Sequence, residues 1–200
     1  MILGVQWYYW LILAVAIIGA VFAWIKVLAS SKERKERLKK EAEIWRKDYE
    51  LREKYSVLTA EKLNECDDIK LLHAVAMNIQ VSLENAIDMN EAFNNLCEEK
   101  KNIYTLEYFD EDAKISLSSF FKNNGAPLLP NILNALQAIN ADDLTEVVSI
   151  LYPMYDPDSE VSIDYSIIQK ADEEFKSIFD SDKLCRKCAV YIKNNKDKFI

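Results

Sequence analysis

The first 25 residues of the chain carry no charged side chain, and this run constrains the fold more than any other feature of the sequence. A helix from Ile2 to Ile25 would be about 36 Å long, which exceeds the roughly 30 Å hydrocarbon core of a bilayer. Residues 1–29 are therefore predicted to form a single transmembrane anchor, with the lipid bilayer as the first partner of the protein.

Aromatic and basic side chains flank this run as they flank membrane spans. The N-terminal side lacks Lys and Arg, whereas basic residues follow the run directly. By the positive-inside rule, a single-pass protein of the cell membrane is expected, with its N-terminus outside and its C-terminal domain cytoplasmic. A cleaved signal peptide ending near Ala29 is the alternative, but the apolar core exceeds the roughly 7–15 residues of a signal h-region. The predicted membrane-interface residues are Trp7, Tyr8, Tyr9, Trp10, Trp24, Lys26, Lys32, Arg34 and Lys35.

The segment 30–58 is predicted to be one charged juxtamembrane helix. It lacks Gly and Pro and is rich in good helix formers. Leu38, Trp45 and Tyr49 share one face, which favours either a short helix pair in a membrane complex or docking on the following domain. Four glutamates precede a basic residue by four positions, which stabilises a helix by about 0.2–0.5 kcal/mol per pair. These pairs are Glu33–Arg37, Glu36–Lys40, Glu43–Lys47 and Glu50–Lys54.

Residues 59–200 are predicted to form a compact, acidic, all-α domain, because apolar residues recur at helical spacing and strand signals are scarce. Breaks are expected at 123–130, 140–142 and 152–162, and Asp143 to Glu146 resemble a capping box. The net charge is +4 up to Lys54 and −12 after it. The overall charge of −8 excludes a basic nucleic-acid-binding arm. The clearest apolar stripes contain Ile69, Leu72, Ala76, Ile79 and Leu83, then Leu144, Val147, Val148 and Leu151, and then Ile168, Ala171, Phe175 and Ile178.

Two groups of potential metal ligands are interpreted as structural. Cys185 and Cys188 have the spacing of a zinc or redox pair, but a structural zinc site needs four ligands and the second pair is missing. We expect buried thiols there. His73, the one histidine, lies beside an apolar stripe and is interpreted as a packing or boundary residue.

The segment 156–164 places oxygen side chains at alternate positions, as in a calcium loop. Val161 and Ile167 occupy the positions that need glycine and a bidentate glutamate, so we interpret the segment as a solvated loop. No glycine-rich phosphate loop, HExxH or GxSxG motif is present. We therefore expect a non-enzymatic protein without a cofactor.

Pairs and triplets of carboxylates recur along the acidic domain and can form a partner-binding surface. Carboxylates near helix starts also stabilise the helix dipole, so most of them need no partner to explain them. The candidate acidic partner surface consists of Asp142, Asp143, Asp172, Glu173 and Glu174.

The stretch from Ser119 to Pro127 and the helix that follows it resemble the bacterial DNA-mimic protein family, the one numbered nineteen in that series. The resemblance covers roughly residues 66–200. Family members commonly carry Asn-Gly-Gly-Phe before the aromatic pair, where this chain has Lys114 to Leu117, and they have Gln where this chain has Ser119. The residues that carry the family-like motif are Ser119, Phe120, Phe121, Asn123, Gly125, Phe175, Tyr191 and Phe199.

The resemblance implies an all-helical acidic fold that occupies the DNA-binding surface of another protein. Together with the predicted anchor, we expect a membrane-anchored interaction module whose partner is a basic or DNA-binding cytoplasmic protein, with no direct binding of nucleic acid. A structural tether in a membrane complex and a metal-dependent domain, using 156–164 or the cysteines, are the alternatives.

Overall fold

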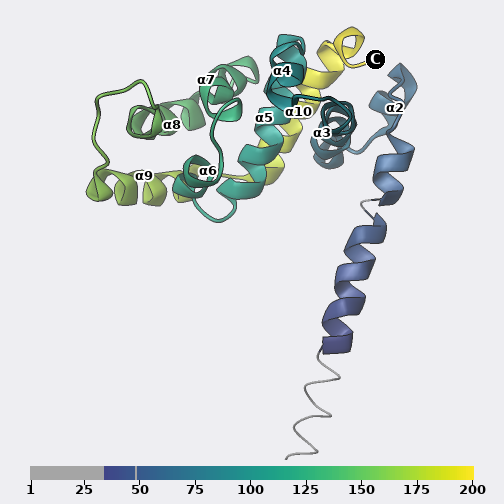
Figure 1. Cartoon of the computed structure of the whole chain (residues 1–200), viewed down its shortest axis with the longest axis horizontal. Helices are drawn as coiled ribbons and strands as arrows, with labels where there is room; N and C mark the ends of the chain where they lie inside the picture. The colour runs from purple at the N-terminus through teal and green to yellow at the C-terminus, as the bar shows by residue number, and fades with distance from the viewer. Residues whose placement is uncertain (1–33, 48) are drawn as a thin grey trace, which may run out of the picture. The chain divides into compact units, whose positions relative to one another are not determined.

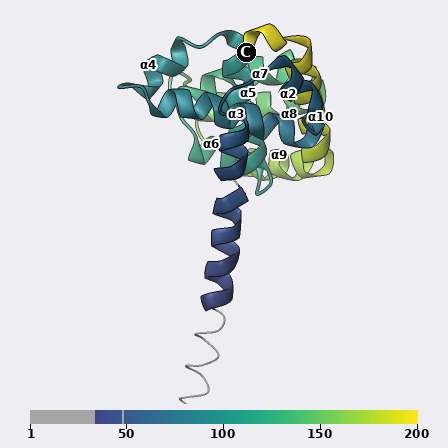
Figure 2. The same cartoon turned by 90° about the vertical axis from the view of Figure 1, so that its right-hand side faces the viewer.

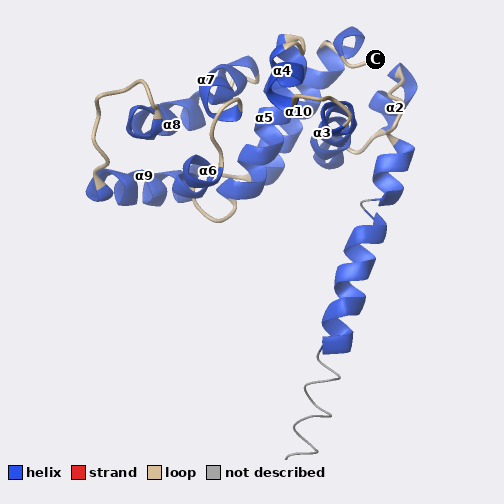
Figure 3. Cartoon of the chain, viewed as in Figure 1, coloured by secondary structure: helices blue, strands red, loops and turns tan. Residues whose placement is uncertain are grey.

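The computed structural model describes residues 34–47 and 49–200. The chain divides into two compact units, residues 1–50 and 51–200. All regular secondary structure in the described ranges is helical (Figure 1 and Figure 3), which confirms the predicted all-α class.

The predicted transmembrane anchor, residues 1–29, lies outside the described residues, as do the interface residues from Trp7 to Lys32. No helix in the described part of the chain is both long and apolar enough to cross a membrane. Arg34 and Lys35 are described, and both are exposed on a helix.

Residues 34–47 and 49–54 are helical, as predicted for the charged segment. Leu38, Trp45 and Tyr49 are exposed, and Trp45 leaves 75% of its surface accessible. Of the four predicted ion pairs, the structure contains Glu43–Lys47 at 3.4 Å. Two further pairs with the same spacing are Arg37–Glu41 at 3.7 Å and Arg46–Glu50 at 3.5 Å.

The second unit is organised around α5 (Glu98–Ala113). Helices α3 (Asp68–Glu84) and α10 (Ser181–Asn194) pack against α5 and against each other (Figure 1 and Figure 2). Two further helices, α6 (Leu117–Asn123) and α7 (Leu128–Ala138), pack on other parts of α5. The last long helix of the chain therefore lies beside the first long helix of this unit.

The remaining helices extend this arrangement. Helix α8 (Asp142–Tyr155) packs on α7 and α9 (Tyr165–Ile178), and α9 packs on α6. Short helices α2 (Ala60–Glu65) and α4 (Met89–Asn94) lie against α10 and α3, respectively, and the 3-10 turn η1 (Lys196–Lys198) follows α10.

Phe109 of α5 lies at the centre of an aromatic cluster and is completely buried. Its ring makes edge-to-face contacts with Phe120, Phe175 and Phe179, at centroid distances of 5.3, 5.8 and 6.3 Å. Such pairs add about 0.5–1.5 kcal/mol each beyond the burial of area. The cluster therefore joins α5, α6 and α9.

Most of the predicted apolar stripes are buried, which confirms the helical periodicity. Ile69 is the exception in the first stripe, with 37% of its surface exposed. The buried stripe residues include Leu72, Ala76, Ile79, Leu83, Leu144, Val147, Val148, Leu151, Ile168, Ala171 and Phe175.

The predicted capping box at Asp143 is wrong. Helix α8 begins at Asp142 after Ala141, which provides no side-chain cap. The Asp143 carboxylate instead accepts from the backbone N–H of Leu144 at 3.1 Å and from Lys183 of α10 at 3.0 Å. Asp143 therefore lies in the first turn of α8 and pairs with another helix, rather than capping the helix start.

The break predicted from position 152 also begins later than expected. Pro153 lies inside α8, which continues to Tyr155. Proline at this position removes the backbone N–H that would otherwise donate to the carbonyl group of Ser149, yet the helix continues for two more residues. The loop is therefore shorter than the proline pattern indicated.

The core of the second unit begins upstream of residue 59, the expected domain boundary. Tyr55 and Leu58 are buried, with 3% and 6% of their surfaces exposed, and Leu51 packs against the core. The Asn78 side chain donates to the backbone carbonyl groups of Tyr55 and Ser56 at 3.0 and 2.9 Å. These hydrogen bonds hold the chain where it turns into the domain.

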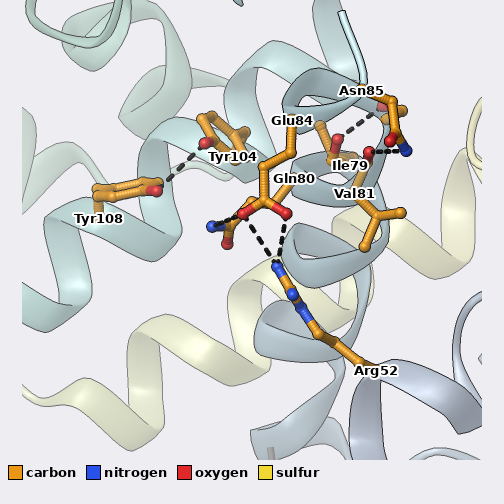
Figure 4. Close-up of polar contacts among 9 residues, drawn as sticks. Arg52, Ile79, Gln80, Val81, Glu84, Asn85, Tyr104 and Tyr108 are labelled. Atoms are coloured by element: carbon orange, nitrogen blue, oxygen red, sulfur yellow. Dashed lines mark hydrogen bonds and ion pairs between the residues drawn. The ribbon is translucent and has the colours of Figure 1, made fainter. Parts of the chain in front are cut away.

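Arg52 attaches the same region to α3. Its guanidinium group contacts both carboxylate oxygens of Glu84 at 3.0 Å, and Gln80 donates to one of them at 2.7 Å (Figure 4). Nearby on α5, the hydroxyl groups of Tyr104 and Tyr108 are 3.1 Å apart.

Replacing Phe109 by Ala is expected to lower the free energy of unfolding by about 3–5 kcal/mol, because three aromatic contacts are lost and a cavity remains. Tyr165→Ala is the matched control, since Tyr165 is 79% exposed and should cost about 0.5 kcal/mol or less. Urea unfolding of the purified chain, followed by circular dichroism, measures both. Equal losses for the two variants would contradict the central role of Phe109.

Candidate functional site

The family-like motif lies mainly in the hydrophobic core. Phe120 and Phe121 are buried with 0% and 3% of their surfaces exposed. The Asn123 side chain donates to Asp112 of α5 at 2.8 Å. Gly125 is exposed, and an added Cβ there would meet no atom within 4 Å. These positions shape the α6 region rather than present side chains to a ligand.

The two C-terminal motif residues also have structural roles. Phe199 is buried. The Tyr191 hydroxyl accepts a hydrogen bond from Asn102 of α5 at 3.4 Å. Both residues thereby attach the end of the chain to the centre of the domain.

Asp172 was predicted to belong to the partner surface, but it caps the start of α6. Its two carboxylate oxygens accept from the backbone N–H and the hydroxyl group of Ser118, each at 2.8 Å. Within α6, Ser116 is the N-cap and accepts from the Ser119 N–H at 3.1 Å. A carboxylate from α9 therefore satisfies a helix start more than 50 residues away in the sequence.

A groove of about 440 Å³ lies beside this cap, between the end of α5, the start of α6 and α9. Ile168, Phe175 and Phe179 contribute its apolar lining. Its charged lining has both signs and consists of Lys114, Lys122, Lys176, Asp172 and Glu173. The structure thus brings part of the family-like motif and part of the predicted acidic surface to one groove.

The other predicted partner-surface residues do not form an uninterrupted acidic patch. The hydrogen bond from Lys183 lowers the pKa of Asp143, so this carboxylate is ionised. The ammonium group of Lys183 balances its negative charge. Glu173 accepts from Gln169 at 3.0 Å. Asp142 and Glu174 are exposed. Three carboxylates, those of Asp142, Glu173 and Glu174, remain available on α8 and α9.

Basic residues are concentrated at the end of the chain, and the net charge of −12 after Lys54 conceals this local reversal of sign. Residues 55–180 contain 24 acidic and eight basic side chains, whereas residues 181–200 contain two acidic and six basic ones. Lys183, Arg186 and Lys187 of α10 line a groove of about 450 Å³ with the end of α7. A running charge count along the sequence would have revealed this reversal.

A second polar cluster lies between α3 and α5. The Nδ1 atom of His73 contacts Oε1 of Glu107, and Glu111 lies one turn further along α5. One ligand atom from each of these three residues lies within 4.8 Å of the other two. The exposed fraction of the side chain is 39% for His73 and 12% for Glu107, while Glu111 is an exposed residue. Glu107 is therefore mostly shielded from solvent, whereas Glu111 is accessible to it.

This cluster is rich in negative charge. Burial, followed by the charge of Glu107, raises the pKa of Glu111. Asp110 has 7% of its side chain exposed and pairs through Oδ2 with Lys114 at 2.6 Å. Its other oxygen, Oδ1, is buried and has no hydrogen-bond partner among the described residues.

The predicted buried thiols are confirmed. Cys185 and Cys188 of α10 are free and buried. Burial raises the pKa of Cys185 to about 11, and the charges of Asp110 and Glu107 act in the same direction. Burial also raises the pKa of Cys188. Protonated, buried thiols are poor nucleophiles.

The carboxylates of the segment 156–164 stabilise local backbone. Asp156 accepts from the backbone N–H of Asp158 at 3.0 Å. Asp164 caps α9 by accepting from Ser166 and Ile167. These contacts support the interpretation of this segment as a solvated loop.

Comparisons with protein-family models, curated proteins and solved structures give no match to this chain.

Replacing Asp172 by Ala is expected to lower the free energy of unfolding by about 1–3 kcal/mol, because Ser118 loses the acceptor for both its N–H and its hydroxyl group. Glu174→Ala, two positions along the same helix, should change it by about 0.5 kcal/mol or less, since that residue is exposed. Urea denaturation of both variants gives the comparison. A negligible loss for Asp172→Ala would show that α6 needs no cap from α9.

Proposed function

We propose that this protein is a single-pass, membrane-anchored, non-enzymatic helical module whose acidic surface binds a basic partner protein in the cytoplasm. The observation that carries the proposal is the separation of charge along the chain. An uncharged N-terminal run and a basic segment precede 126 residues, 55–180, with a net charge of −16. Such a field steers positively charged partners and repels nucleic acid.

The available carboxylates on α8 and α9 make this the favoured binding region. Asp142, Glu173 and Glu174 are not engaged by a basic side chain in any described ion pair. The adjoining groove adds apolar surface from Ile168 and Phe179. Glu173 lines this groove and Glu174 follows it on α9, and such a combination of charged and apolar surface is typical of protein interfaces.

DNA mimicry is the more specific form of this proposal. DNA carries one charge per about 1.7 Å of duplex axis, and a mimic must present carboxylates that a basic surface accepts in place of phosphates. The resemblance of residues 66–200 to the DNA-mimic family supports it. If the protein mimics DNA, the partner binds DNA and this protein through the same basic surface, and the two compete for it.

A structural tether remains the second candidate function, and the exposed apolar side chains of the first unit favour it. Leu38, Ile44, Trp45 and Tyr49 are exposed to between 52% and 75% of their surfaces. Two such helices from different chains would bury these side chains against each other. In the binding experiment below, a tether corresponds to a self-associated chain that captures no basic protein.

The full chain in detergent micelles is expected to capture a basic protein from cytosol, with an affinity that falls as ionic strength rises. Neutralising Asp142, Glu173 and Glu174 together, as D142N/E173Q/E174Q, should weaken binding roughly tenfold, at about 0.5 kcal/mol per charge. Neutralising three exposed glutamates of α2 and α4, as E61Q/E65Q/E91Q, is the charge-matched control, because these residues lie on other helices than α8 and α9. Biolayer interferometry over a salt series measures both.

Two outcomes would contradict this proposal: the absence of a basic partner at low salt, and binding that is insensitive to salt. Displacement of the partner by duplex DNA supports mimicry. Simultaneous binding of DNA and this protein refutes mimicry and leaves a plain acidic module.

Cys97 provides a test of topology, because it is exposed whereas Cys66, Cys185 and Cys188 are buried. A membrane-impermeant maleimide applied to intact cells should leave Cys97 unlabelled. Permeabilised cells should show labelling of Cys97 first, and the other three cysteines only after denaturation. Labelling of Cys97 in intact cells would place the domain on the outer side and overturn the orientation.

A further inference from the structure

The cluster of His73, Glu107 and Glu111 has the donor atoms of a metal site. His73 comes from α3, and the two glutamates are one turn apart on α5, so two packed helices converge on one point. Helical bundles commonly build metal sites from side chains on facing helices. Because Glu107 and Glu111 are four positions apart, both carboxylates lie on the same side of α5.

The distances are close to those of a coordination sphere. In a tetrahedral zinc site with bonds of about 2.0–2.1 Å, ligand atoms lie about 3.3 Å apart. The three donor atoms here lie within 4.8 Å of one another. A shift of about 1.5 Å, within the reach of glutamate side-chain rotation, closes the remaining gap.

The charges around the cluster also favour a cation. Glu107, Asp110 and Glu111 lie within five residues of one another on α5, and the basic groups that act on them are His73 and Lys114. Lys114 already pairs with Asp110. The facing thiols of Cys185 and Cys188 are protonated and supply no positive charge. Partly buried carboxylates without sufficient counter-charge repel each other, and a bound cation removes that repulsion.

We propose that His73, Glu107 and Glu111 bind one divalent transition-metal ion that links α3 to α5. One imidazole nitrogen and two carboxylates suit Zn²⁺, Mn²⁺ or Fe²⁺, whereas Mg²⁺ and Ca²⁺ prefer oxygen ligands alone. The exposed side of Glu111 leaves room for water to complete the coordination and for the ion to enter. The site is independent of the acidic partner surface on α8 and α9.

The ion is expected to stabilise the domain, because it binds the folded arrangement of two helices that are separate in the unfolded chain. Metal binding also replaces any proton at Nδ1 of His73, so it competes with the contact between His73 and Glu107.

Zn²⁺ is the probe for the test. The full chain is purified in detergent micelles through a tag that contains no histidine, treated with EDTA and titrated by calorimetry. We expect one Zn²⁺ per chain and a rise of several degrees in the unfolding temperature. Glu111→Gln and His73→Asn should each weaken binding at least tenfold. Glu98→Gln, an exposed glutamate at the start of the same helix, should leave binding unchanged.

The single histidine of the chain makes a second readout specific. In nitrogen-15 spectra, the imidazole resonances belong to His73 without further assignment, and Zn²⁺ should shift the Nδ1 signal. Glu111→Gln keeps an exposed side chain of the same shape, so a well-folded circular dichroism spectrum with weakened binding supports the site.

Several results would overturn the proposal. Unchanged imidazole resonances at saturating Zn²⁺ would mean that His73 and Glu107 form an ion pair alone. Affinity that survives both variants would place the ion elsewhere. A sulfur-to-metal charge-transfer band with Co²⁺ would place it on the cysteines.

Discussion

The burial of α5 is the constraint on which the rest of the domain depends. Phe109 on one side of this helix is surrounded by rings from α6 and α9, while α3, α7 and α10 cover other sides. Burying an aromatic side chain of this size contributes about 3 kcal/mol, and the surrounding helices cannot separate without exposing it. The same helix places Glu107 and Glu111 roughly opposite Phe109. The core and the polar cluster thus share one scaffold.

Charge in this protein has two uses that composition does not distinguish. Some carboxylates satisfy backbone groups or basic side chains: Asp172 caps α6, Asp164 caps α9, and Asp143 pairs with Lys183. Others are exposed and unengaged by basic side chains in the described ion pairs, and these form the surface to which we assign partner binding. The basic face of α10 adds a second field of opposite sign. A partner therefore meets a polarised surface rather than a uniformly acidic one.

Secondary structure was largely predictable, because helical periodicity reports directly on which residues are buried. The stripes around Leu72, Val147 and Ile168 are buried as expected. Local rules failed where a tertiary contact replaced a local one. The capping box at Asp143 was wrong because α8 begins at Asp142, so that Asp143 lies in the first turn and pairs with Lys183 of α10. This contact with Lys183 is not visible in a window of neighbouring residues.

The sequence by itself determined the helical class, the burial of Cys185 and Cys188 and the separation of charge, because periodicity and composition are properties of short stretches. Only the tertiary structure decided which charges act together. It joined His73 to Glu107 across 34 residues of chain and brought Glu111 to the same place, and it joined Asp172 to Ser118 across 54 residues. Packing α3 and α9 against α5 and α6 determines these pairings. Contacts between distant residues depend on how the helices pack. That packing is determined by side chains throughout the core, so no single motif predicts it.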